Sequence, residues 1–185
     1  MVVLPGGFSG GDEPDGSGKF IASFLRNPRL TDAIHDLLRD RDGLMLGICN
    51  GFQALIKLGL VPYGEIRAMD EGCPTLTFNT IGRHQSRYVT TRVASVQSPW
   101  MLQSHVATST PSPSPTRGPL HSPPGGAGAA DRERPDRHPV RGRLRRGLHG
   151  HRRQPQRLPG AIEGIFSPDG RVFGKMGHSE RRGPM

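Results

Sequence analysis

The stretch GLMLGICNGFQALIKLGL, residues 43–60, decides how this chain folds. Its first half is short and apolar, as is typical of a buried strand, and Phe52 and Ile56 follow at helical spacing. Between the two halves lies GICNG, residues 47–51, in which glycines flank Cys49 and allow a tight turn. A strand that enters a helix through such a turn is typical of a nucleophile, because the bend presents one side chain to a substrate.

Two interpretations of Cys49 remain open at this point. As a nucleophile it would lie at the N-terminus of a helix, where the exposed N–H groups and the helix dipole lower the pKa of a thiol below its usual value of ~8.5. The alternative is a buried cysteine that ends a core strand. The Gly-x-Cys-x-Gly spacing after an apolar strand is compatible with both.

Composition limits the classes of protein that need to be considered. The chain has 185 residues but is only 33% hydrophobic, with 26 glycines and 18 prolines. Two cysteines give neither a disulfide framework nor a four-cysteine zinc site, which favours a reducing cytoplasm. The apolar start MVVL ends at Pro5, so no signal peptide is expected, and no apolar run has the length of a membrane span.

The net charge of +9 is concentrated in one segment. Residues 106–160 contain 11 arginines, no lysine and 3 acidic residues, a net charge of +8, whereas the rest of the chain has a net charge of +1. The same segment has 10 of the 18 prolines and lacks Ile, Phe, Tyr and Trp. Such a composition predicts disorder, because too little apolar surface can be buried to offset the entropy of ordering. A basic nucleic-acid-binding module is the competing interpretation, although no aromatic residue is present to stack on bases.

Outside that segment the pattern predicts an α/β fold, with a parallel sheet flanked by helices. The strands and helices alternate, and a hairpin with the turn SPDG, residues 167–170, ends the chain. The expected elements are strands at 1–4, 44–48, 76–78 and 88–93, a polar loop at 79–87, helices at 19–25, at 29–41 after Asn27-Pro28 and from Phe52, and hairpin strands at 161–165 and 171–176.

The hairpin leads to the sequence Gly177-His178-Ser179-Glu180. A thiol, an imidazole and a carboxylate fit a nucleophile, a general base and a group that orients the base. On an extended strand end, residues 178 and 180 share one face. The alternatives are a solvated surface histidine, and a glutamate paired with Arg181 or Arg182.

Four motifs resemble the C-terminal class I glutamine amidotransferase domain of phosphoribosylformylglycinamidine synthase of the large single-chain type. They are PGGFSGGDEPDGSGKFIASFLRNP, GLMLGICNGFQALIKLGLVPYG, LTFNTIGRHQSRYVTTRV and AIEGIFSPDGRVFGKMGHSER, and together they cover residues 1 to about 105 and 161–185. The resemblance implies a flavodoxin-like fold, glutamine as substrate, and ammonia delivered to a synthetase domain that makes formylglycinamidine ribonucleotide in purine biosynthesis. It implies no cofactor in this domain, since ATP and Mg belong to the synthetase domain.

The resemblance also assigns roles to residues, position by position. Cys49 is the nucleophile that forms a glutamyl thioester, His178 is its base, and Glu180 is the partner of the base. The backbone N–H groups of Gly7 and Asn50 form the oxyanion hole, and Gln53 lies beside the glutamine. An amidotransferase that serves another synthetase is the closest alternative.

The chain departs from the family pattern in the basic segment, and a frameshift explains how. When the possible codons of residues 106–116 are read from the third base of each codon, they permit the family sequence GDVHTVAVSH. Read from the second base, the codons of residues 131–140 permit IANGQIATQY, and those of residues 154–158 permit NPNGS. We therefore expect residues 1–105 to be the first part of the domain, without its N-terminal strand and helices. Residues 106–160 would be a disordered frameshift product and residues 161–185 the terminal hairpin. The expectation is an incomplete, inactive domain that binds neither nucleic acid nor membrane.

Overall fold

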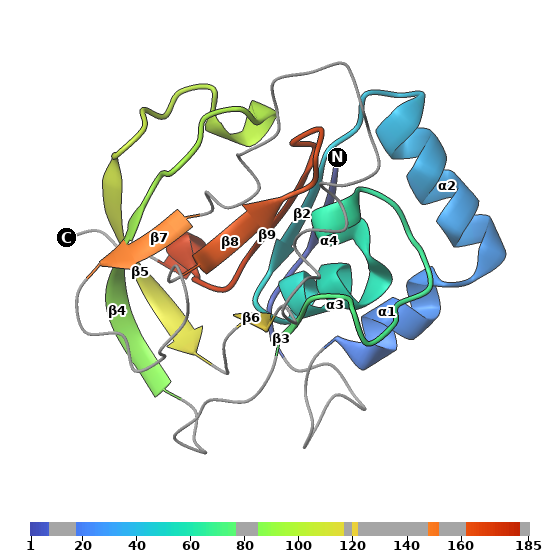
Figure 1. Cartoon of the computed structure of the whole chain (residues 1–185), viewed down its shortest axis with the longest axis horizontal. Helices are drawn as coiled ribbons and strands as arrows, with labels where there is room; N and C mark the ends of the chain where they lie inside the picture. Colours follow the sequence, from blue (N-terminus) through green and yellow to red (C-terminus); the bar gives the residue numbers. More distant parts are fainter. Residues whose placement is uncertain (8–17, 77–84, 117–119, 122–147, 152–161, 182–185) are drawn as a thin grey trace.

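A computed structural model describes residues 1–7, 18–76, 85–116, 120–121, 148–151 and 162–181. In this part of the chain the strands form a seven-stranded sheet in the order β1-β2-β9-β8-β7-β4-β5, and β3 pairs with β6 in a second sheet of two strands. Figure 1 shows the helices grouped beside β1, β2 and β9, while β4, β5 and β7 lie at the opposite end of the molecule. The labelled α-helices therefore flank one end of the sheet and not the other (Figure 1).

The helix-flanked end of the sheet is parallel, as the sequence predicts. Its strands are β1 (Val2–Leu4), β2 (Met45–Ile48) and β9 (Val172–Lys175). Leu46 in β2 pairs with Val3 on one side and with Phe173 on the other, so β2 is central. Because parallel strands end at the same edge of a sheet, β1, β2 and β9 deliver the chain segments that follow them to one place.

Four helices accompany these strands: α1 (Lys19–Leu25), α2 (Pro28–Arg39), α3 (Asn50–Leu58) and α4 (Leu60–Tyr63). The Asn27 side chain accepts a hydrogen bond of 3.1 Å from the Arg29 N–H at the start of α2, which confirms the helix start predicted at Asn27-Pro28. Helix α3 begins at Asn50, two residues before the predicted start. No helix in the described residues combines the length and the apolarity needed to cross a membrane.

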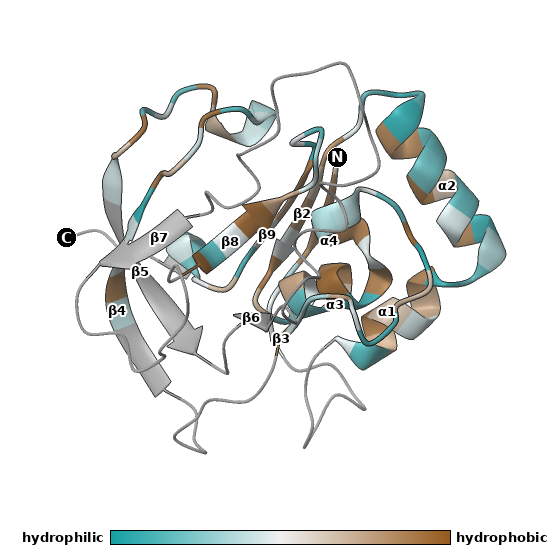
Figure 2. Cartoon of the chain, viewed as in Figure 1, coloured by the Kyte–Doolittle hydropathy of each residue, from teal (hydrophilic) through white to brown (hydrophobic). Residues whose placement is uncertain are grey.

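The core lies where α3 packs on the parallel strands. Every residue of α3 except Lys57 is buried, and Figure 2 shows hydrophobic residues on α3 and along the neighbouring strands. A Cβ atom on Gly174 in β9 would lie only 2.0 Å from Phe52 Cδ2, so this glycine lets the Phe52 ring lie directly on the strand. Burial of each such large apolar side chain stabilises the fold by roughly 1.5–3 kcal/mol.

The other strands are antiparallel, so the sheet is mixed rather than parallel throughout. They are β8 (Ile162–Phe166), β7 (Leu148–His151), β4 (Gln85–Arg92) and β5 (Ser109–Thr116), and the small sheet pairs β3 (Thr75–Leu76) with β6 (Leu120–His121). The predicted hairpin is confirmed as β8 and β9. Strand β4 includes residues 85–87, which the sequence analysis placed in a polar loop. Residues 77–84 lie outside the described part.

Part of the segment predicted to be disordered forms strands. Within residues 106–160, β5, β6 and β7 pair with neighbouring strands through their backbones, which needs no apolar side chain. Strand β5 has the sequence STPSPSPT and lies at the edge of the sheet. Its prolines alternate, so the missing N–H groups all fall on one side of the strand, as an edge strand allows. Residues 117–119, 122–147 and 152–161 lie outside the described part, and there disorder stays a prediction.

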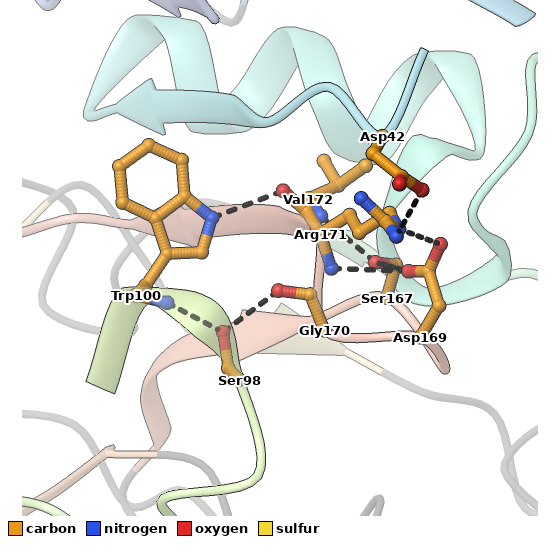
Figure 3. Close-up of polar contacts among 8 residues, drawn as sticks. All are labelled: Asp42, Ser98, Trp100, Ser167, Asp169, Gly170, Arg171 and Val172. Carbon is orange, nitrogen blue, oxygen red and sulfur yellow. Dashed lines mark hydrogen bonds and ion pairs between the residues drawn. The ribbon is translucent and has the colours of Figure 1, made fainter. Parts of the chain in front are cut away.

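A group of polar contacts fixes the turn between β8 and β9 (Figure 3). Ser98, which precedes the short helix η1 (Pro99–Met101), donates its hydroxyl to the Gly170 carbonyl at 2.7 Å. Trp100 Nε1 donates to the Arg171 carbonyl at 3.0 Å, and Arg171 Nη2 lies 2.6 Å from Asp42 Oδ1. These contacts join segments on both sides of residues 106–160, and they hold the hairpin that leads to His178.

Candidate active site

Cys49 is the single residue between β2 and α3, and its backbone is strained. It has φ 53° and ψ −106°, a conformation that costs a non-glycine residue about 1–3 kcal/mol. Hydrogen bonds hold it on both sides: the Cys49 N–H donates to the Lys175 carbonyl at 2.8 Å, and the Cys49 carbonyl accepts from the Gln53 N–H at 3.0 Å. The thiol is half-buried at the N-terminus of α3.

The two glycines around Cys49 are required by close backbone contacts. A Cβ on Gly47 would lie 2.8 Å from the Gly51 carbonyl oxygen, and a Cβ on Gly51 would lie 2.1 Å from the carbonyl oxygen of Leu4 in β1. The first of these carbonyls belongs to α3 and the second to β1, so a side chain at either glycine would push the helix or the strand away from the turn. The Gly-x-Cys-x-Gly spacing is therefore the condition for the turn to close against β1.

Gly6, in the loop after β1, is the point at which the candidate residues meet. A Cβ placed on Gly6 would lie 3.1 Å from Cys49 Cβ, 3.1 Å from His178 Nε2 and 2.5 Å from His178 Cε1. The cysteine and the imidazole thus converge on one position although 129 residues separate them in sequence. Glycine at this position leaves the space between them open.

His178 is buried, with 3% of its surface exposed, and Glu180 is its partner. His178 Nδ1 lies 2.5 Å from Glu180 Oε1, and Nε2 is the ring nitrogen on the side of Gly6, the position that Cys49 also borders. The route to this pairing differs from the predicted one. Strand β9 ends at Lys175, and Ser179–Arg181 forms a 3₁₀ turn, η2, so the turn brings residues 178 and 180 together rather than strand alternation.

Electrostatics favour an ionised Glu180. Burial acts to raise its pKa, but the hydrogen bond from its own backbone N–H, the contact with His178 and the charge of Lys175 outweigh burial and lower the pKa. Lys175 shows the opposite balance: burial lowers its pKa, while the charges of Glu180 and Glu163 act to raise it. The carboxylate beside the imidazole is therefore available to accept a hydrogen bond from the Nδ1–H group.

The other three residues from the sequence analysis lie around the same turn. Asn50 and Gln53 are both in α3, one and four residues after Cys49, and both are buried, with 1% and 6% of their surfaces exposed. Gly7 is exposed, follows Gly6 in the loop after β1, and has φ 107°, which favours glycine. The structure thus places them near Cys49 in the fold.

A pocket of about 410 Å³ elsewhere on the molecule is lined by none of the candidate site residues. It lies between α1, α3 and residues 69–75, and Lys19, Arg26 and Lys57 are among its lining residues. Arg26 and Lys57 lie at the C-terminal ends of α1 and α3, where positive charge stabilises the helix dipole, and Arg26 Nη2 donates to the Lys57 carbonyl at 2.9 Å. The helix ends thus account for these two cations.

Comparison with known protein families identifies the fold around Cys49. Residues 1–123 match the model of the CobB/CobQ-like glutamine amidotransferase domain, about two thirds of the chain. The chain belongs to this glutamine amidotransferase family. The described Cys49 turn, the Gly6 loop and strands β1 and β2 all lie within the matched residues, whereas His178 and Glu180 lie outside them.

The similar proteins are named as phosphoribosylformylglycinamidine synthase or as its subunit PurQ. The phosphoribosylformylglycinamidine synthase subunit PurQ of Dehalococcoides mccartyi is 40% identical over 88 residues, which are 48% of this chain and 32% of that protein. The phosphoribosylformylglycinamidine synthase of Drosophila melanogaster is 31% identical over 97 residues, 52% of this chain and 7% of that protein. The chain thus matches a third or less of the length of these relatives.

A solved structure resembles the fold of this chain. The structure of PurLQS from Thermotoga maritima matches with a TM-score of 0.64 and 23% sequence identity, and the match covers 97% of this chain and 69% of that chain. The structural match therefore includes the β8–β9 hairpin, which the family model does not reach. At this identity the match shows the shared fold.

Sequence reasoning did not single out three residues that border this candidate site. Gly6 was quoted only within the motif that begins PGGF, although its lack of a side chain is what lets Cys49 and His178 converge. Lys175 and Glu163 were quoted only within the motif that ends GHSER, without a role. Their importance follows from the pairing of β8 with β9, which a single sequence does not reveal.

Proposed function

We propose that this domain hydrolyses glutamine and supplies the released ammonia to a synthetase. The observation that carries the proposal is the convergence of Cys49 and His178 on Gly6, with Glu180 2.5 Å behind the imidazole. A thiol, an imidazole and a carboxylate in this order form a nucleophile, a base and a group that orients the base. Membership in a glutamine amidotransferase family supports glutamine as the substrate.

In the proposed reaction each residue has one task. His178 Nε2 takes the proton of the Cys49 thiol, and the sulfur attacks the side-chain carbonyl carbon of glutamine. When the tetrahedral intermediate collapses, His178 returns the proton to the departing nitrogen, ammonia leaves, and a glutamyl thioester remains on Cys49. Water, activated by the same imidazole, then hydrolyses the thioester to glutamate. Glu180 keeps the imidazole in the tautomer that presents Nε2 to sulfur.

Three further residues complete the proposed site. The N–H groups of Gly7 and Asn50 stabilise the oxyanion of the tetrahedral intermediate, and Gln53 lies beside the bound glutamine. Asn50 follows Cys49 at the N-terminus of α3, where helix N–H groups point outward and the dipole favours negative charge. The exposed Gly7 has φ 107° and follows Gly6, the position at which an added Cβ would meet both Cys49 and His178.

The proposed partner is the synthetase of phosphoribosylformylglycinamidine synthesis, the name that the relatives carry. There the ammonia would convert formylglycinamide ribonucleotide to formylglycinamidine ribonucleotide, with ATP and Mg bound by the synthetase and no cofactor in this domain. The proposed compartment is the cytoplasm, which agrees with two cysteines that form no disulfide. An ammonia acceptor of another pathway is the alternative partner, and the acceptor that stimulates glutamine hydrolysis distinguishes the two.

The test is ammonia release from glutamine by three proteins. We expect little or no activity from the chain as written, because the proposed frameshift replaces residues 106–160, and activity from a version in which the family sequence is restored there. Cys49→Ala in the restored version should abolish the activity, since no other thiol is placed beside His178 in the described residues. An active Cys49→Ala protein would disprove the nucleophile assignment, and full activity of the chain as written would disprove the consequence of the frameshift.

A further inference from the structure

We propose that Lys175 and Glu163 are positioning residues that hold the His178–Glu180 pair against Cys49 from the side of the β8–β9 hairpin. The inference rests on the proposed glutaminase site and concerns two residues to which the quoted motifs assign no role. Both lie beyond residue 123, where the match to the family model ends. Glu163 lies in β8, and Lys175 lies in β9, which pairs with β8 on one side and with β2, the strand before Cys49, on the other. The site therefore depends on the strand at which the parallel and antiparallel parts of the sheet meet.

Lys175 connects the nucleophile to the segment that carries the base. Its carbonyl accepts the Cys49 N–H at 2.8 Å, at the start of the strained turn. Its ammonium group donates to the Ser179 hydroxyl, which lies between His178 and Glu180 in sequence. Any residue supplies the carbonyl contact, but only a long cationic side chain supplies the second contact together with a positive charge near Glu180.

Glu163 fixes the residues just before the imidazole. Its carboxylate oxygen Oε1 accepts the backbone N–H of Gly177, and its backbone carbonyl accepts the Met176 N–H at 3.0 Å. Two consecutive N–H groups after the end of β9 are thus bonded to a single residue of β8. This arrangement determines the direction in which the chain leaves the strand, and so the position of the buried His178 ring.

The charges of these residues alternate along the site. Lys175, which is half-buried at the end of β9, is influenced by Glu163 on β8 and by Glu180 on η2, and Glu180 in turn contacts His178. Burial lowers the pKa of Lys175, and the two carboxylates oppose that effect. The positive charge of Lys175 contributes to the lowered pKa of Glu180. Removal of Lys175 would therefore loosen the η2 turn and raise the pKa of Glu180.

The experiment follows the reactivity of Cys49 with iodoacetamide in the full chain, with Cys73→Ser in every protein so that one thiol remains. Two matched pairs are compared: Lys175→Met with Lys175→Arg, and Glu163→Leu with Glu163→Gln. Met and Leu remove the polar contact, whereas Arg keeps a cation and Gln keeps an acceptor for the Gly177 N–H. Lys57→Met is the control, since Lys57 is a half-buried lysine that does not border the site. The pKa of Glu180 is measured by carboxyl carbon NMR.

We expect Lys175→Met and Glu163→Leu to slow alkylation roughly tenfold, because a displaced imidazole no longer activates the thiol. Lys175→Arg, Glu163→Gln and Lys57→Met should stay within about twofold of the parent. The pKa of Glu180 should rise in Lys175→Met and stay unchanged in Lys57→Met, a difference that a general loss of stability would not produce.

A further variant, His178→Asn, separates the failure of this inference from the failure of the proposed function. If His178→Asn slows alkylation while Lys175→Met and Glu163→Leu do not, the positioning role is disproved and the Cys49–His178 pair stands. If His178→Asn leaves alkylation unchanged, the proposed activation of Cys49 by His178 is disproved, and the positioning role with it. A variant that does not fold, as judged by circular dichroism, leaves the other pair to decide the outcome.

Discussion

The two ends of the central sheet are held together in different ways. At the parallel end, β2 and β9 contain fully buried side chains such as Met45 and Val172, both 0% exposed, and α3 packs across them. At the antiparallel end, β4 exposes 73% of Tyr88, and its edge partner β5 has the sequence STPSPSPT. The parallel end is specified by side-chain packing, and at the antiparallel end the described contacts are the backbone pairings between strands.

This difference bears on where a site can form. A strained residue such as Cys49 persists only where its surroundings determine its conformation, and those surroundings are the tightly packed glycines and strands of the parallel end. The base comes from the hairpin that borders both ends of the sheet. Cys49 thus lies at the end of the sheet that contains the buried side chains, and the position of its base depends on how β8 and β9 are held.

The largest expected effect compares one aromatic residue from each end. Phe52→Ala removes a ring that is 2% exposed and lies on Gly174, and we expect it to lower the free energy of unfolding by about 3–5 kcal/mol. Tyr88→Ala removes a ring that is 73% exposed and should change it by less than about 0.5 kcal/mol. Urea unfolding of the two variants measures both values. Similar losses would contradict the proposed contrast between the ends.

A smaller effect is expected in amide hydrogen exchange of the unmodified chain. The amides of β2 and β9 should exchange at least about tenfold more slowly than those of β4 and β5, because opening the packed end exposes more apolar surface. Amides of β8 should fall between the two groups, since β8 joins them. Equal protection across the whole sheet would show that it opens as one unit and would remove the distinction.

The smallest expected effect concerns Glu180, where the hairpin meets the parallel end. Its pKa in the folded protein lies below the ordinary value of 4.5, so it stabilises the fold fully above that pH and less as the pH falls through the folded value. In Glu180→Gln, the free energy of unfolding should fall less steeply as the pH drops below 4.5, and its dependence on pH above about 6 should be unchanged. The measurement is the unfolding midpoint as a function of pH. Parallel curves for the two proteins below pH 4.5 would contradict the assignment.

Much of the parallel end could be predicted because its signals are local. Apolar runs, the Asn27-Pro28 helix start and the glycines around Cys49 place β1, α1, α2, β2 and α3 within a few residues of their positions. The antiparallel end was harder to predict. Strand β5, which pairs with β4, lies in a segment whose composition predicts disorder, because backbone pairing leaves no apolar pattern in sequence.

The sequence by itself determined the strand-turn-helix unit at Cys49 and the presence of a histidine and a glutamate two residues apart, because these depend on spacing and on the conformational freedom of glycine. Only the tertiary structure decided that Gly6 lies between Cys49 and His178, that η2 rather than a strand pairs His178 with Glu180, and that Lys175 and Glu163 support them. The physical reason is that Gly6 and Cys49 lie more than 100 residues from His178 in sequence. Glu163 reaches Gly177 across the β8–β9 hairpin, where sheet register sets the neighbours. The contacts within η2 are local in sequence, but they depend on the point at which β9 ends, which its pairing with β2 and β8 sets.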